Sequence, residues 1–145
     1  MKKIIIINGP NLNLLGTREV NIYGKTTLEE IQKLSEKKAD ELNLSLNFFQ
    51  SNNESEIIEL IHETENNYDG LIINPAAFTH TSVALLDALK AISKPKIEIH
   101  LSNIYSREDF RKNSITSNGV DGLICGFGSL TYIIAIDAIN GLLTK

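Results

Sequence analysis

The chain has 145 residues, of which 42% are hydrophobic and 22% charged, and its formal net charge is −4. These values are typical of one globular domain, and they exclude a disordered or fibrous chain. The negative charge also argues against nucleic acid as a partner, because phosphate binding needs a basic surface.

The sequence gives no indication of secretion or membrane insertion. The first apolar run, residues 4–7, is too short for the hydrophobic region of a signal peptide or for a membrane span. The single cysteine, Cys125, excludes an internal disulfide and is typical of a reducing compartment. We therefore expect a cytoplasmic protein that does not bind membranes.

Strand-like apolar runs alternate with segments of helical periodicity. In chain order the pattern predicts strand 3–7, helix 27–42, strand 44–49, helix 53–66, strand 70–73, helix 81–92, strand 96–101, strand 122–125 and helix 129–143. Continuous β-branched runs separated by helices indicate a parallel sheet covered on both faces. The pattern favours a single α/β domain over residues 1–145, a flavodoxin-like doubly wound five-stranded parallel sheet of order 2-1-3-4-5.

Two predicted helices begin with capping signals. Thr27 and Glu30 have the spacing of a capping box, and Asn53 is suited to cap the second helix. In the first helix the apolar residues Leu28, Ile31, Leu34 and Leu42 are expected near one face.

Polar clusters follow three of the predicted strands, in residues 8–23, 74–80 and 100–111. Ligands of open parallel sheets bind outside the carboxyl ends of the strands, near the point where strand order reverses. In the order 2-1-3-4-5 these three strands are neighbours, so we expect their clusters to form one crevice.

The three arginines lie only in these clusters, although the chain has eleven lysines. They are Arg18, Arg107 and Arg111. A guanidinium suits a carboxylate or phosphate in a way that lysine does not, so the placement indicates an anion site. The alternative is that three arginines fall there by chance.

The connection over residues 8–25 is long for a βα unit. Three glycines punctuate it, which favours a mobile lid at approximately residues 16–25. Tyr23 can act as a base only if its pKa of ~10 is lowered, and the nearby Arg18 guanidinium would favour the phenolate. The alternative is that Tyr23 packs its ring against the domain.

Glu98 and His100 lie two residues apart on a predicted strand, so their side chains share a face. A buried carboxylate there would hold one imidazole nitrogen and favour the charged ring. His100 would then turn its other nitrogen into the crevice as a general acid. The alternative is a charge pair on a half-exposed strand.

The segment 74–81 leaves the third strand and enters a helix. It offers the Asn74 amide, free backbone N–H groups and the His80 imidazole near a helix N-terminus, where oxygen-rich ligands are favoured. The alternative is that Asn74 only begins a turn. Asp87, farther along the helix, has the simple alternative of a surface pair with Lys90.

Several chemistries are excluded by spacing. The histidines and the cysteine show no zinc-site pattern. The glycines after the first strand form neither a dinucleotide-binding motif nor a P-loop, and there is no nucleophile elbow. We therefore expect no metal and no bound nucleotide.

Three segments together carry a resemblance to a known family. Residues 8–19 read Asn-Gly-Pro-Asn-Leu-Asn-Leu-Leu-Gly-Thr-Arg-Glu, with Tyr-Gly at 23–24; residues 74–82 read Asn-Pro-Ala-Ala-Phe-Thr-His-Thr-Ser; residues 98–103 read Glu-Ile-His-Leu-Ser-Asn. They closely resemble the type II 3-dehydroquinate dehydratases. The similarity continues to residues 126–128, so it covers essentially the whole chain.

The resemblance implies a cofactor-free hydro-lyase. Such an enzyme dehydrates 3-dehydroquinate to 3-dehydroshikimate by anti elimination through an enolate, in the shikimate or quinate pathway. A competing hypothesis is a non-catalytic flavodoxin-like module that binds a small hydroxy or keto acid. A purely structural or interaction domain would leave the placement of the arginines unexplained.

Matched residue by residue, the resemblance assigns five catalytic positions. Tyr23 takes the C2 proton, and Arg18 lowers the pKa of Tyr23. His100 protonates the departing hydroxyl and is oriented by Glu98. Asn11 helps to hold the water or enolate region.

The resemblance also implies the binding residues and the assembly. The substrate's hydroxyls and carboxylate are bound by Asn74, His80, Leu101, Ser102 and Arg111, partly through the backbone N–H groups of residues 101 and 102. Arg107 has a supporting role. The family's counterpart of Asp87 reaches a neighbouring subunit's site in a trimer, and four trimers form a homododecamer. The chain departs from the family pattern at Val20, where proline is usual, and at residues 112–113, where a histidine usually precedes the serine.

Overall fold

One parallel sheet of five strands organises the molecule. The computed structural model describes residues 1–17 and 19–145, and Tyr23 by its backbone alone. The strands are β1 (Lys2–Asn8), β2 (Leu44–Gln50), β3 (Gly70–Asn74), β4 (Lys96–His100) and β5 (Gly122–Cys125). All pairs are parallel and the order is β2-β1-β3-β4-β5, which confirms the predicted topology.

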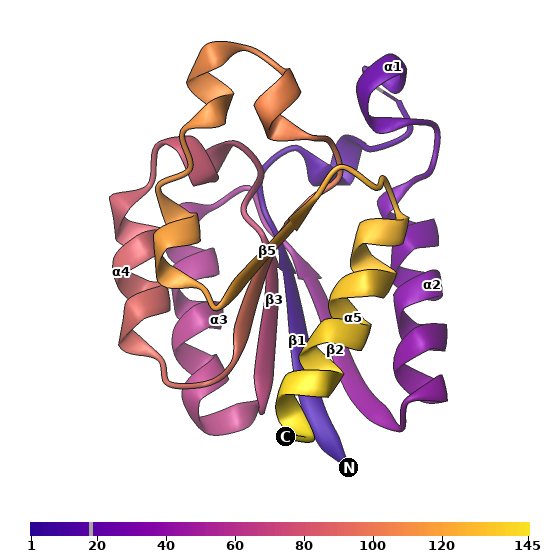
Figure 1. Cartoon of the computed structure of the whole chain (residues 1–145), viewed down its shortest axis with the longest axis vertical. Helices are drawn as coiled ribbons and strands as arrows, with labels where there is room; N and C mark the ends of the chain where they lie inside the picture. The colour runs from indigo at the N-terminus through magenta and orange to yellow at the C-terminus, as the bar shows by residue number, and fades with distance from the viewer. Residues whose placement is uncertain (18) are drawn as a thin grey trace.

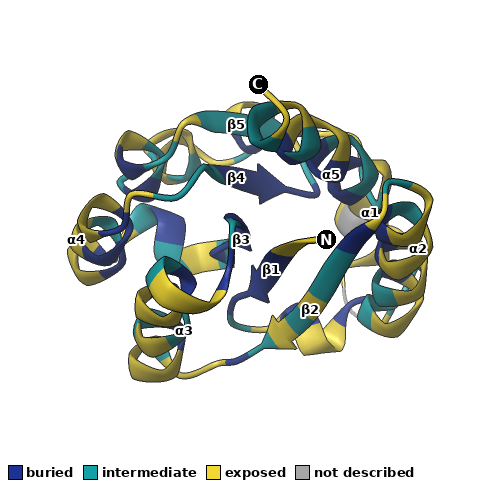
Figure 2. Cartoon of the chain, turned by 90° about the horizontal axis from the view of Figure 1, so that it is seen from below, coloured by how far each residue is buried: buried dark blue, intermediate teal, exposed yellow. Residues whose placement is uncertain are grey.

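Helices cover both faces of this sheet (Figure 1). They are α1 (Val20–Tyr23), α2 (Leu28–Glu41), α3 (Glu54–Asn67), α4 (Val83–Ala91) and α5 (Leu130–Leu143). Seen along the sheet, α2 and α5 lie on one face, and α3 and α4 on the other (Figure 2). No helix in the described part of the chain is long and apolar enough to cross a bilayer.

Short 3-10 helices, which the sequence pattern did not predict, occupy the connections. They are η1 (Leu12–Leu14), η2 (Ala76–His80), η3 (Ile104–Ser106), η4 (Asp109–Lys112) and η5 (Thr116–Gly119). In Figure 1, α1 and the η3–η4 segment stand at the same end of the molecule, and both termini lie at the other end.

The alternation of β1 explains why its apolar run is continuous. Ile4 and Ile6 are fully buried in a core with α2 and α5, whereas Ile5 and Ile7 are fully buried in a second core with α3 and α4. A strand covered on both faces needs apolar side chains at every position.

The same alternation decides where the polar residues of β4 point. Ile97 and Ile99 belong to the core with α2 and α5. Successive side chains of a strand point to opposite faces, so Glu98 and His100 turn to the face that carries α3 and α4.

The two predicted helix caps are confirmed, but the prediction that Leu34 belongs to the apolar face of α2 is wrong. Thr27 Oγ1 accepts a hydrogen bond from the Glu30 N–H (3.2 Å), and Asn53 Oδ1 accepts one from the Ser55 N–H (2.9 Å). Leu34, expected on the same face as the buried Ile31, is 45% exposed. The buried positions of α2 are instead spaced four apart, at 31, 35 and 39, so the leucine lies beside the stripe.

The helix predicted from residue 81 begins later. Residues 76–80 form η2, and Ser82 Oγ then accepts from the Leu85 N–H (2.9 Å) to start α4 at Val83. His80 therefore lies within the 3-10 helix η2, and not at the N-terminus of an α-helix.

The ends of β1 and β3 are pressed together. The Gly9 N–H donates to the Asn74 carbonyl (2.8 Å), and a Cβ on Gly9 would lie 2.5 Å from the Pro75 oxygen. Ala76, which follows Pro75, has a φ of 52°. This left-handed conformation costs about 1–2 kcal/mol in residues other than glycine. This close approach fixes the turn that follows β3.

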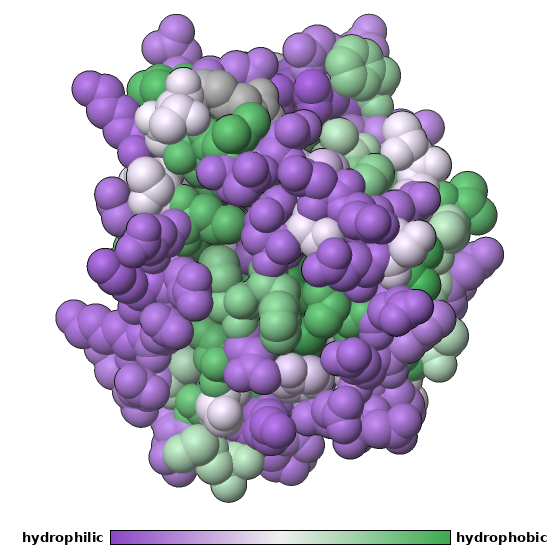
Figure 3. Space-filling view, turned by 180° about the vertical axis from the view of Figure 1, so that it is seen from behind, coloured by the Kyte–Doolittle hydropathy of each residue, from purple (hydrophilic) through white to green (hydrophobic). Residues whose placement is uncertain are grey.

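Hydrophobic residues also gather on the surface of the molecule. On the side opposite the view of Figure 1, a band of hydrophobic residues crosses an otherwise hydrophilic surface (Figure 3).

We predict that Gly9→Ala destabilises the protein by about 1–3 kcal/mol, because the added methyl group would lie 2.5 Å from the Pro75 carbonyl oxygen and the backbone would have to shift. Urea unfolding measures this change. Gly141→Ala in α5 is the control: its Cβ would meet nothing within 4 Å, and the substitution should stabilise the helix by about 0.5–1 kcal/mol. A Gly9→Ala protein as stable as the wild type would contradict the prediction.

Candidate active site

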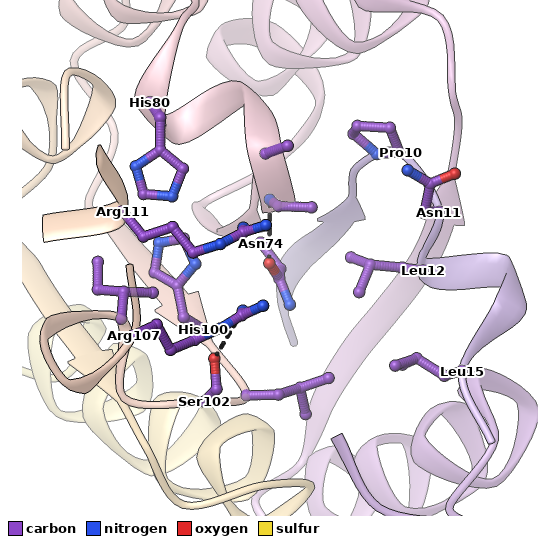
Figure 4. A pocket seen from close by; sticks show the side chains of 14 residues that line it. Pro10, Asn11, Leu12, Leu15, Asn74, His80, His100, Ser102, Arg107 and Arg111 are labelled. Carbon is purple, nitrogen blue, oxygen red and sulfur yellow. Dashed lines mark hydrogen bonds between the residues drawn. The ribbon is translucent and has the colours of Figure 1, made fainter. Parts of the chain in front are cut away.

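A pocket of about 200 Å³ opens at the carboxyl ends of β1, β3 and β4. The three polar segments meet there, as the sequence predicts. Its polar lining residues are Asn11, Asn74, His80, His100, Ser102, Arg107 and Arg111. Figure 4 shows both arginines and both histidines on one side of the pocket and residues 10–15 on the other.

Two guanidinium groups give the pocket its charge. The Arg107 side chain is 11% exposed and donates to Ser102 Oγ (3.3 Å). Arg111 is 24% exposed and donates through Nε to Glu108 Oε2 (2.6 Å). Both reach into the pocket in Figure 4, and none of its described lining residues is acidic. The pocket therefore favours an anion, and the planar fork of arginine suits a carboxylate.

A hydrogen bond to the backbone orients the His80 ring at the pocket. Its Nδ1 lies 2.9 Å from the Asn113 carbonyl oxygen. A carbonyl can only accept, so Nδ1 carries the proton and Nε2 remains for a ligand. Because the backbone of residue 113 makes this bond, the departure from the family pattern at that position leaves it intact.

Glu98 and His100 form a buried pair on β4. Glu98 is fully buried, and its Oε2 lies 2.7 Å from His100 Nε2. An ionised carboxylate only accepts, so Nε2 donates to it and Nδ1 is the nitrogen left for the pocket. Because Nε2 keeps its proton in this bond, His100 can deliver a proton from Nδ1 only when both ring nitrogens carry one.

Three hydroxyl groups surround the Glu98 carboxylate. Thr79 Oγ1 donates to Oε2 (2.7 Å), Thr116 Oγ1 donates to Oε1 (2.5 Å), and Ser114 Oγ donates to Oε2 at 3.3 Å. Burial on its own would raise the pKa of Glu98. The hydrogen bond and charge of His100, with the Thr116 and Thr79 hydroxyls, outweigh burial and hold that pKa below its usual range. The carboxyl group is therefore charged at neutral pH.

Tyr132 supports the pocket from below. This fully buried phenol on α5 donates to Asn8 Oδ1 (2.6 Å) and accepts from Asn74 Nδ2 (3.0 Å). Burial raises the pKa of Tyr132, so the group remains a neutral phenol. Asn74 Oδ1 in turn accepts from the Ala76 N–H (3.2 Å). The Asn74 amide is thus oriented from both ends.

Sequence reasoning missed these supporting residues. Thr79 lies in a segment that carries the family resemblance, but nothing in the pattern indicates its contact with Glu98. Ser114 and Thr116 lie in an irregular segment without periodicity, and Tyr132 has the pattern of an ordinary core residue of α5.

The remaining predicted residues divide into two groups. Asn11, Leu101 and Ser102 line the pocket, and the Asn11 N–H donates to Asn52 Oδ1 (2.9 Å). Asp87 is exposed on α4 and does not line the pocket of its own chain.

Two of the predicted catalytic groups, the base and its guanidinium partner, are not among the described side chains. Arg18 lies outside the described residues, and so does the side chain of Tyr23, whose backbone ends α1. Residues 1–17 and 19–145 contain no group of three or more His, Cys, Asp or Glu that could hold a metal ion.

Comparison with known proteins agrees with this geometry. Residues 2–140 match the model of the family described as dehydroquinase class II. The 3-dehydroquinate dehydratase of Caldicellulosiruptor saccharolyticus is 55% identical over 144 residues, which cover 99% of both chains. The 3-dehydroquinate dehydratase of Thermoanaerobacter pseudethanolicus is 50% identical over 140 residues, 97% of this chain and 95% of its own. The chain belongs to the class II dehydroquinase family.

A solved structure shows the same fold. The type II dehydroquinase of Butyrivibrio crossotus superposes with a TM-score of 0.94 at 45% identity, covering 96% of this chain and 97% of its own. In this class II dehydroquinase the described residues supply a cationic pocket and a buried carboxylate–imidazole pair.

We predict that Glu98→Gln lowers stability at pH 7 by about 1–3 kcal/mol, because buried donors lose a charged acceptor. The folded pKa of Glu98 lies below that of the unfolded chain, about 4.3. Its contribution is therefore complete above pH ~4.3 and is lost as the pH falls through the folded value. The difference between variant and wild type should narrow over that window.

Urea unfolding at a series of pH values measures this difference. Glu59→Gln, the same change at an exposed position of α3, is the control and should follow the wild type throughout. A Glu98→Gln curve parallel to the wild-type curve at every pH would contradict the assigned ionisation.

Proposed function

We propose that this class II dehydroquinase removes water from 3-dehydroquinate to give 3-dehydroshikimate, with no metal or organic cofactor, in the shikimate pathway. One observation carries the proposal: a pocket with two arginines and a carboxylate-held imidazole, in a chain whose relatives at 50–55% identity are named 3-dehydroquinate dehydratase.

The substrate's carboxylate is held at the cationic side of the pocket. Arg111 binds it, with the backbone N–H groups of Leu101 and Ser102, and Arg107 supports Ser102 through its hydrogen bond. Asn74 and His80 bind the hydroxyls. His80 presents Nε2 for this purpose because Nδ1 is committed to a backbone carbonyl.

Elimination begins with proton removal at C2. Tyr23, as phenolate, takes the proton, and the Arg18 guanidinium favours that phenolate. The electrons of the C–H bond pass toward the ketone oxygen and form an enolate, whose region Asn11 helps to hold. Residues 16–25 act as a lid over this step, bounded by Gly16 and Gly24, which both have positive φ.

Loss of the hydroxyl completes the reaction. The enolate electrons return and break the C–O bond, while His100 gives its Nδ1 proton to the departing oxygen, so that water leaves. His100 remains neutral with Nε2 donating to Glu98. The proton held by Tyr23 then passes to solvent and a proton from solvent returns to His100 Nδ1, so that both groups regain their starting forms. Tyr23 and His100 act from opposite sides of the substrate, as anti elimination requires.

Absorbance of the conjugated product tests the proposal directly. The wild-type protein given 3-dehydroquinate should form an ultraviolet-absorbing enone, with and without a chelator. Binding without any rise in absorbance would instead make the chain a non-catalytic binding module.

We predict that Tyr23→Phe and His100→Ala each lower kcat at least about 100-fold, because each removes one partner of acid–base catalysis. Circular dichroism is the control for folding. Near-normal turnover in Tyr23→Phe would exclude the assigned base.

Borohydride added with substrate should leave the enzyme active, whereas inactivation through a lysine adduct would indicate a Schiff base.

The proposed assembly is a cytoplasmic homododecamer of four trimers, in which Asp87 completes a neighbouring subunit's site. Two features support it. Asp87 and Val83, one turn apart on α4, are both exposed, and Val83 is apolar and 56% exposed. An apolar band also crosses one face of the molecule (Figure 3).

Sedimentation should give the mass of twelve chains. Asp87→Ala should lower kcat/KM about 10-fold although the residue is outside its own chain's pocket, because a charged contact to the neighbouring site is lost. Asp40→Ala, at an exposed position of α2, is the control and should retain full activity. A fully active monomer would contradict the assembly.

A further inference from the structure

Thr79, Ser114 and Thr116 bring three hydroxyl groups together, the hydroxyl cluster. No step of the proposed elimination uses them. Thr79 Oγ1 lies 2.7 Å from Ser114 Oγ and 2.7 Å from Thr116 Oγ1. Thr79 and Thr116 are both fully buried. A buried hydroxyl without a hydrogen-bond partner costs folding free energy. Contact with the charged carboxylate therefore favours one fixed position for each of these hydroxyls.

The cluster engages both oxygens of the Glu98 carboxylate. Thr116 donates to Oε1 at 2.5 Å, and Thr79 donates to Oε2 at 2.7 Å, the oxygen that also accepts from His100. With both ends held, the carboxylate cannot rotate about its terminal torsion. The direction in which the imidazole ring points is then fixed through its partner.

The cluster also joins segments that are distant in sequence. The Ile115 N–H donates to the Thr79 carbonyl (2.7 Å), and His80 Nδ1 donates to the Asn113 carbonyl (2.9 Å). Residues 113–116 are therefore bound along η2, directly after η4, which carries Arg111. One continuous stretch, residues 109–116, therefore carries both Arg111, which lines the pocket, and the Ser114 and Thr116 hydroxyls, which donate to Glu98.

We propose that Thr116, together with Thr79 and Ser114, is a positioning residue that fixes the Glu98 carboxylate so that His100 presents its acidic proton to the pocket. The inference rests on the proposed function, since it concerns the acid of that reaction. Thr116 has the leading role because it is the residue of the cluster that donates to Oε1.

The other titratable groups around Glu98 are few among the described residues. His100 shares its strand, and Cys125 lies on β5, opposite His100 in the strand register. Burial, and to a lesser degree the charge of Glu98, raise the pKa of the Cys125 thiol, so this thiol stays neutral near pH 7. Lys96, also on β4, donates through Nζ to the Ile92 carbonyl (2.8 Å). His80 on η2 and the two arginines are the other charged or chargeable groups among the described residues that line the pocket with His100.

The test compares Thr116→Val, Thr116→Ser and the matched control Thr64→Val. Thr64 is also fully buried, but its hydroxyl donates to the Leu60 carbonyl within α3, away from the pocket. The measurements are kcat for 3-dehydroquinate at pH 7 and the free energy of unfolding in urea as a function of pH, with circular dichroism to establish folding.

We predict that Thr116→Val lowers kcat about 10-fold, the loss expected from one hydrogen bond to a charged group. Removing that donor raises the pKa of Glu98, so the ionised form disappears at a higher pH. The acid limb of the stability profile, the pH range over which the contribution of Glu98 to the free energy of unfolding is lost, should therefore move up by about 0.5–1 pH unit. Thr116→Ser, which keeps the hydroxyl, should restore both quantities, and Thr64→Val should leave the acid limb in place.

A wild-type acid limb in Thr116→Val, or equal effects in Thr116→Val and Thr64→Val, overturns the inference but leaves the proposed function standing. A wild-type protein that forms no enone overturns both. If Thr116→Val does not fold, Ser114→Ala decides: it should lower kcat about threefold, with the acid limb displaced in the same direction. An unchanged acid limb in Ser114→Ala then rejects the proposal.

Discussion

A charged carboxylate without solvent contact is the interaction on which this site depends. Glu98 is fully buried, and a buried charge is stable only when paired and hydrogen-bonded. His100 donates to it through Nε2, and the remaining donors are three hydroxyls, from Thr79 in η2, Ser114 before η5 and Thr116 at the start of η5. If one of these donors were removed, the buried carboxylate would lose part of the stabilisation that its charge needs. Glu98, His100 and the three hydroxyls therefore depend on one another.

Sheet topology explains why that unit lies beside an anion pocket. β1, β3 and β4 are adjacent, and their carboxyl ends deliver three loops to one place. The contact between Gly9 and Asn74 and the buried phenol of Tyr132 hold the first two loops at a fixed separation. His100, the last residue of β4, therefore lies beside two loops whose positions are fixed.

Features that arise from sequence periodicity were predictable, and features that arise from tertiary hydrogen bonds were not. The β-branched runs, the Thr27 and Asn53 caps and the polar ends of three strands gave the sheet, its order and the position of the crevice. Leu34 and the start of α4 were wrong because packing, and a 3-10 turn over residues 76–80, overrode the local pattern. The hydroxyl cluster left no signal, since a buried threonine and an exposed one look alike in sequence.

The hydrogen bond between Tyr132 and Asn8 joins residues 124 positions apart. It means that the floor of the pocket is absent from any nascent chain that lacks α5. A ribosome-bound intermediate could carry both arginines and the acid and still have a loose Asn74. Contacts this remote in sequence form slowly, because a long loop must close before they contribute. The ability to turn over substrate should accordingly be among the last properties that the newly made protein acquires.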